Sequence, residues 1–140
     1  MQWVALSVGL AIHDEQIAEH GGLDGIRDFS FQESALLRPK NLFAHEQADL
    51  ADLAACYACG LVRNHAFADG NKRTSAVVTL LFLRLNGARL AASEAECLEI
   101  WTALGAGAIR ERELAAWIRQ RIVRSSPGEP GPPPAQPRDP

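Results

Sequence analysis

Nine consecutive residues, His65 to Arg73, hold most of the groups in this chain that could act together chemically. They read His-Ala-Phe-Ala-Asp-Gly-Asn-Lys-Arg. An apolar stretch from Thr74 to Leu85 follows at once and predicts a buried helix, so Gly70 and Asn71 fall where a loop becomes a helix. The backbone N–H groups and the positive dipole end of such a junction attract anions such as phosphate. The segment therefore predicts a phosphate-binding turn.

The two cations of this segment break a local rule. Lys72 and Arg73 lie in the first helical turn, where positive charge is unfavourable for the helix itself. A bound polyphosphate would reverse that penalty, with arginine as a fixed fork and lysine as a point charge. A broken local rule is often found where a function explains it.

The remaining polar groups of the segment suit transfer chemistry. His65 can accept a proton from a hydroxyl near neutral pH, and Asp69 can hold a divalent cation against phosphate oxygens or orient the hydroxyl. Asn71 can donate its amide to developing negative charge. Each group alone also has an ordinary explanation, as a turn, a helix start or a surface charge. Their combination favours a site, whereas His13, His20 and His45 are interpreted as capping or solvated residues.

Composition predicts one modest cytoplasmic domain. The 140 residues are 47% apolar and carry a formal charge of −3, which gives no general attraction to nucleic acid or anionic membranes. Three cysteines indicate reduced thiols, and the Cys56–Cys59 pair within an alanine-rich stretch favours core packing over zinc or redox chemistry. No apolar run is long enough to cross a bilayer.

The sequence divides into a folded domain, residues 1–124, and a tail, residues 125–140. The tail contains every proline except Pro39 and almost nothing apolar. Such a composition cannot offset the entropy of ordering, so we expect a disordered segment with polyproline II character.

Helical periodicity dominates the domain and predicts an all-α bundle of about six helices. The first carries apolar residues at Leu10, Ala11, Ile17 and Ala18 and is expected to stop at Gly21–Gly22. Residues 40–48 are expected to be a loop or small hairpin, more simply a connection than a flap, and Ala88 to Leu90 is too short to classify. The expected helices are 7–20, 30–39 opened by a Ser30–Glu33 capping box and ended by Pro39, 49–64 capped by Asp49, 70–86, one opened by a Ser93–Glu96 capping box, and 111–123.

The nine-residue motif resembles that of the Fic/Doc family, in its death-on-curing (Doc) branch. Ile12–Asp14, Glu33–Leu36 and Leu81–Gly87 are also similar to that branch, and the resemblance covers most of residues 3 to 120. It implies an all-α fold whose loop binds nucleotide phosphates and whose histidine activates a protein hydroxyl.

Two departures from the common Fic pattern refine the expected activity. Most Fic proteins transfer AMP and have a glycine where this chain has Lys72 and a second arginine where it has Ala76. Doc-type members share these departures. For them the family activity is transfer of the γ-phosphate of ATP to a threonine or serine of the elongation factor that delivers aminoacyl-tRNA. The resemblance thus implies the toxin of a type II toxin–antitoxin pair, which arrests translation.

Carried over by position, the resemblance assigns a role to each motif residue. His65 matches the catalytic histidine, and Asp69 matches the acidic residue that supports it and the Mg²⁺ ion. Asn71 and Lys72 match phosphate-binding positions, with Gly70 and Arg73 beside them. Arg63 falls where Doc-like proteins often have a basic residue, although a cation there also suits a helix C-terminus.

Two other functions remain open, and regulation is expected in trans. The same motif could transfer AMP or UMP, or the chain could be a non-catalytic module that binds an antitoxin or nucleotide. The inhibitory helix of some Fic proteins has no good match, since Ser125 and Glu129 have its spacing but Pro130 follows. A separate antitoxin whose C-terminal segment folds onto the toxin is therefore the expected inhibitor.

Overall fold

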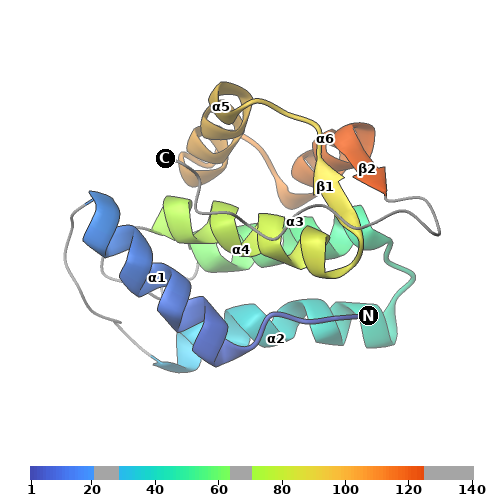
Figure 1. Cartoon of the computed structure of the whole chain (residues 1–140). Helices are drawn as coiled ribbons and strands as arrows, with labels where there is room; N and C mark the ends of the chain where they lie inside the picture. The colour runs from blue at the N-terminus through green and yellow to red at the C-terminus, as the bar shows by residue number, and fades with distance from the viewer. Residues whose placement is uncertain (21–28, 64–70, 125–140) are drawn as a thin grey trace.

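The computed structural model describes residues 1–20, 29–63 and 71–124, and within these ranges it is an all-α bundle with one small ribbon (Figure 1). The predicted fold class is thereby confirmed. The expected disorder of residues 125–140 lies outside the described residues. The elements are α1 Leu6–His20, α2 Phe29–His45, α3 Leu50–Arg63, α4 Asn71–Leu85, β1 Ala88–Leu90, α5 Glu94–Gly105, α6 Glu111–Arg121 and β2 Ile122–Arg124.

Helix α3 forms the centre of the molecule. All of its side chains from 50 to 62 are buried except that of Asp52, which is half-buried. Alanine and cysteine make up much of this helix, so α2, α4 and α6 can pack closely around it (Figure 1). Near the middle of α3, the ring of Tyr57 lies 4.8 Å from that of Phe82 on α4, and its hydroxyl accepts a hydrogen bond of 3.0 Å from the backbone of Val4.

Helix α2 is longer than expected because Pro39 does not end it. The helix runs through Pro39 to His45, so the prediction of a stop there, and of a loop or hairpin over residues 40–48, was wrong. A proline inside a helix costs about 3 kcal/mol, because the carbonyl four residues earlier loses its donor. That carbonyl belongs to Ala35, which packs so closely on Gly60 of α3 that a methyl group at Gly60 would lie 3.5 Å from its oxygen. Pro39 itself is buried, and the helix that contains it packs along α3.

Helix α1 buries a different face from the one its apolar residues suggest. Gly9, His13 and Gln16 are buried, whereas Ala11 and Ala18 are exposed and Leu10 is half-buried. The side chain of Ile17 lies outside the described set. Helix α1 packs mainly on α4.

The second half of the chain follows its local signals closely. Ser93 and Glu96 form the expected reciprocal capping box at the start of α5. Helix α6 ends at Arg121, two residues earlier than predicted, because the chain then forms β2. Strand β2 pairs antiparallel with β1, with Ala88 opposite Arg124. The turn between α4 and β1 uses Gly87 at a φ of 75°, which favours glycine.

Arg119 on α6 forms ion pairs with two carboxylates at the start of α3. Arg119 Nε lies 2.7 Å from Asp49 Oδ2, and its Nη2 lies 2.9 Å from Asp52 Oδ1. The backbone N–H of Asp52 also donates to Asp49 Oδ1 at 2.9 Å, which confirms Asp49 as the cap of α3. The Arg119 guanidinium and these hydrogen bonds hold the pKa of Asp49 well below its usual range.

We predict a small, pH-dependent loss of stability for Arg119→Ala. A carboxylate with a lowered pKa stabilises the fold fully above its unfolded pKa of about 3.9, and this contribution is lost progressively as the pH falls from there through the lower pKa of the folded state. Because the network is exposed, the loss at pH 7 should be about 1 kcal/mol or less. Urea unfolding at pH 7 and pH 3 measures it. Arg112→Ala is the control, since Arg112 on the same helix forms no ion pair among the described residues; an equal loss at both pH values would contradict the prediction.

Candidate active site

The motif joins the ends of two neighbouring helices, α3 and α4. His65, Asp69 and Gly70 lie outside the described residues, so their predicted roles stay predictions. Arg63 ends α3 and Asn71 begins α4, and only the backbone of these two residues is described. The predicted loop-to-helix junction is confirmed at its helical side, because α4 begins directly after Gly70.

The first turn of α4 has charged residues on its exposed side and small polar residues on its buried side. Lys72 and Arg73 are exposed, and the next two residues, Thr74 and Ser75, are buried. The two cations thus lie at the positive end of the α4 dipole, as predicted. Thr74 and Ser75 anchor this turn to three other helices, α1, α3 and α5.

The first anchor is His13 of α1. Its Nδ1 lies 3.2 Å from Thr74 Oγ1, which is within hydrogen-bond distance, and only 1% of the residue is exposed. The interpretation of His13 as a capping or solvated residue was therefore wrong. His45 is exposed at the end of α2, as expected, and the side chain of His20 is not among those described. Sequence gave no sign of the His13–Thr74 pair, because its members are 61 positions apart.

The second anchor links three helices through one hydroxyl. Ser75 Oγ donates to the carbonyl of Ala58 on α3 at 2.9 Å and accepts from Trp101 Nε1 on α5 at 2.9 Å. All three groups are buried, so each hydrogen bond is costly to lose. The start of α4 is thereby held against α3 and α5.

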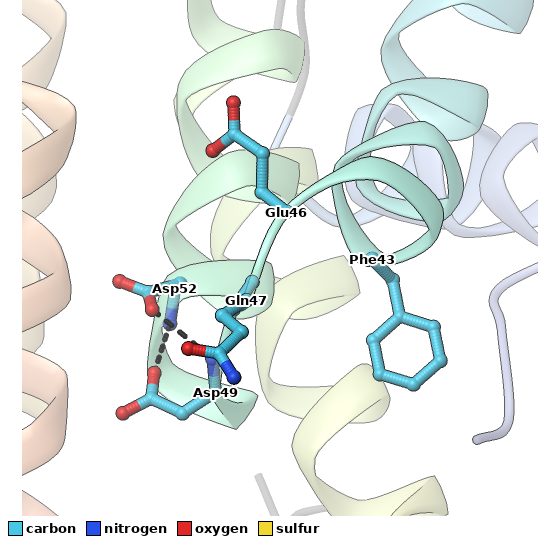
Figure 2. A pocket seen from close by; sticks show the side chains of 6 residues that line it. Phe43, Glu46, Gln47, Asp49 and Asp52 are labelled. Atoms are coloured by element: carbon cyan, nitrogen blue, oxygen red, sulfur yellow. Dashed lines mark hydrogen bonds between the residues drawn. The ribbon is translucent and has the colours of Figure 1, made fainter.

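A surface hollow in the described part of the chain lies at the start of α3, whereas the motif follows the other end of this helix. It measures about 530 Å³ and lies at the turn between α2 and α3 (Figure 2). Since α3 has 14 residues, this hollow is about 20 Å along the helix from Arg63. Carboxylates line it, which makes it unsuited to phosphate. Its lining residues are Phe43, Glu46, Gln47, Ala48, Asp49 and Asp52.

The paired cysteines belong to the core. Cys56 and Cys59 are buried on α3, and burial raises the pKa of Cys56 to about 12, so its sulfur stays a protonated thiol at neutral pH. Among the described residues, no group of three or more histidine, cysteine, aspartate or glutamate side chains is placed to hold a metal ion. Core packing, the favoured interpretation of this pair, is confirmed.

Comparison with known proteins identifies the family. A model of the Fic/DOC family matches residues 3–83. The protein kinase doc of Escherichia phage P1 is 34% identical over 112 residues, which cover 79% of this chain and 88% of that protein. The toxin Doc of Mycolicibacterium smegmatis (strain ATCC 700084 / mc(2)155) is 40% identical over 74 residues, which cover 51% of this chain and 57% of that protein. Within the described ranges, no helix has the length and apolar character to span a membrane. The chain belongs to the Fic/DOC family.

Proposed function

We propose that this protein is a Doc-type toxin, a protein kinase that transfers the γ-phosphate of ATP to a serine or threonine hydroxyl. One observation carries the proposal: helix α4 begins at Asn71, within the His65–Arg73 motif, and presents Lys72 and Arg73, both exposed, in its first turn. Two cations at a helix N-terminus are favourable when a polyanion binds there. The kinase and toxin names of the two relatives agree with this activity.

The proposed reaction needs one base and one in-line displacement. His65 accepts the proton of the target hydroxyl, whose oxygen forms a bond to the γ-phosphorus. The bond from that phosphorus to the bridging oxygen breaks, and ADP leaves with the electron pair. The proton remains on the imidazole until water accepts it. A histidine suits this step because its pKa lies near cellular pH.

The other motif residues bind and orient the triphosphate. Gly70 and Asn71 offer backbone N–H groups at the start of α4, and Lys72 and Arg73 neutralise the phosphate oxygens. Arg63, at the end of α3, would add a cation from the other side of the motif. These groups stabilise charge that spreads over the transferred phosphoryl group.

Asp69 would hold a Mg²⁺ ion together with phosphate oxygens of the substrate. Proteins commonly bind Mg²⁺ through one or two carboxylates plus substrate phosphates, so a single aspartate in the motif fits this donor set. The ion would neutralise charge that develops on the phosphates during transfer.

Transfer of AMP or UMP is the alternative, and one observation disfavours it. Ala76, which replaces the second arginine of AMP-transferring relatives, is half-buried and packs against the apolar core. A phosphate-binding cation is thus replaced by a small packing residue, and Lys72 adds bulk where those relatives have glycine. Both changes remove features that the nucleotidyl-transfer motif uses.

Labelled ATP separates the two reactions. We expect label from [γ-³²P]ATP to remain on the target protein and label from [α-³²P]ATP to be absent from it, because only the transferred group stays attached. The target to use is the elongation factor that delivers aminoacyl-tRNA, and mass spectrometry locates the modified hydroxyl. Retention of α-label would favour nucleotidyl transfer instead.

We also propose that the toxin acts in the cytoplasm and that a cognate antitoxin neutralises it. An antitoxin whose C-terminal segment folds on binding would couple inhibition to its own abundance. Expression of the toxin alone should arrest growth, and co-expression of the neighbouring reading frame should relieve the arrest. A harmless toxin in the absence of any partner would contradict this part of the proposal.

A further inference from the structure

The side chain of Lys72 lies against the end of helix α5. A methyl group added at Gly105, the last residue of α5, would lie 2.9 Å from Lys72 Cδ and 3.2 Å from its Cγ. Carbon atoms in contact prefer about 3.5–4.0 Å. The stem of Lys72 can therefore keep this course only while residue 105 has no side chain.

The backbone does not explain the glycine at this position. Among the described glycines, only Gly87 and Gly107 have positive φ angles, so the conformation of Gly105 is open to any residue. Alanine is a better helix former than glycine. Glycine at 105 thus makes helix α5 less stable than alanine would. What the glycine provides in the structure is space for the Lys72 side chain.

The spacing of residues on the two helices makes this contact specific. Trp101 and Gly105 are four residues apart on α5, and Lys72 and Ser75 are three apart on α4, so each pair shares one face of its helix. The 2.9 Å hydrogen bond from Trp101 to Ser75 sets how closely the two faces approach. One turn further along, Gly105 receives the lysine stem. The dipole of α5 is negative at this end, which favours a nearby ammonium group.

We propose that Gly105 is a positioning residue for Lys72, which directs the ammonium group toward the phosphates of the nucleotide. The proposal rests on the proposed kinase function, because it gives Lys72 its phosphate-binding role. A bulkier residue at 105 would push the stem aside and weaken nucleotide binding without touching the nucleotide itself.

A double-mutant cycle with Gly105→Ala and Lys72→Ala tests the proposal. Gly105→Ala should raise the KM for ATP about fivefold or more and leave kcat within about twofold, because a binding contact weakens while the reacting groups are unchanged. In the Lys72→Ala background the same substitution should change KM by less than about twofold, because coupling disappears with one partner. Ala106→Ser is the matched control, since it adds one heavy atom at the exposed neighbouring residue.

Thermal unfolding gives a readout that does not depend on activity. Gly105→Ala should raise the midpoint more in the Lys72→Ala background than in the wild type, where displacement of the lysine opposes the gain in helix propensity. Equal midpoint shifts in both backgrounds would overturn the proposal. So would an unchanged KM, or a KM effect that persists without Lys72. Absence of γ-phosphate transfer by the wild-type protein would instead overturn the proposed function, and the unfolding cycle would still decide on the contact.

Discussion

Replacement of His65 by alanine is expected to abolish growth arrest and to slow γ-phosphate transfer by a factor of about 10²–10⁴, the usual contribution of a general base. The target hydroxyl then has no group positioned to accept its proton. The fold should survive, because the hydrogen bonds that anchor the start of α4 come from His13 and Trp101 and do not involve residue 65. Transfer from [γ-³²P]ATP and far-UV circular dichroism measure the two effects.

The matched control for this variant is His45→Ala. His45 is an exposed histidine at the end of α2. It lies in sequence just before the start of α3, whereas the motif follows the other end of α3, so its loss should leave activity and growth arrest unchanged. Growth arrest by the His65→Ala variant would support the third interpretation, a binding module that does no chemistry. Loss of toxicity together with loss of helical structure would show that residue 65 is needed for the fold, which would contradict the prediction.

Phe82→Ala is expected to cause the largest loss of stability, about 3–5 kcal/mol in the free energy of unfolding. The Phe82 side chain is fully buried, and its ring lies 4.8 Å from Tyr57 and 5.9 Å from Trp3. Removal of the ring leaves a cavity where α4, α3 and the N-terminal segment meet. A small domain has only about 5–15 kcal/mol of net stability, so the variant should be close to unfolding.

Urea denaturation of the purified protein measures this loss, with Leu98→Ala as the control. Leu98 is an apolar residue on α5 that is 70% exposed, and its truncation should change the free energy of unfolding by about 0.5 kcal/mol or less. A loss below about 1 kcal/mol for Phe82→Ala would mean that the neighbouring rings close the cavity.

Sequence predicted best the elements whose signals are local. Asp49 and Ser93 each cap a helix through bonds to residues three positions away, so a short window of sequence contains the whole interaction. The junction at Asn71 was also predictable, because a polar loop, a glycine and an apolar helix follow in order. The motif that defines the family lies at this junction, which is why the resemblance could be stated from residues alone.

Long-range packing produced the wrong predictions. Pro39 lies within a helix that packs on α3, and no residue near it in sequence signals that packing. Likewise, buried His13 lies within hydrogen-bond distance of Thr74, which is 61 positions away. Strand β2 pairs with β1, where Ala88 lies opposite Arg124, 36 positions away. In each case the deciding partner is distant in the chain, and local propensity was overridden.

The support of the candidate site was invisible for the same reason. Trp101 and Gly105 read as ordinary residues of an amphipathic helix, yet one donates to Ser75 and the other leaves room for Lys72. The nine-residue motif could be found without them. The contacts that anchor the start of α4 could not, since their partners lie on helices distant in the chain, and Trp101 and Gly105 lie beyond residue 83, where the family match ends.

The burial of α3 on all sides has a consequence for amide hydrogen exchange. Backbone protons in its middle can meet solvent only when α2, α4 and α6 separate, which amounts to global unfolding. Helix α1 packs mainly on α4, so we expect its amide protons to exchange through local unfolding that leaves the other helices in place. The motif is thus covalently attached, at its N-terminal side, to the slowest-exchanging part of the protein.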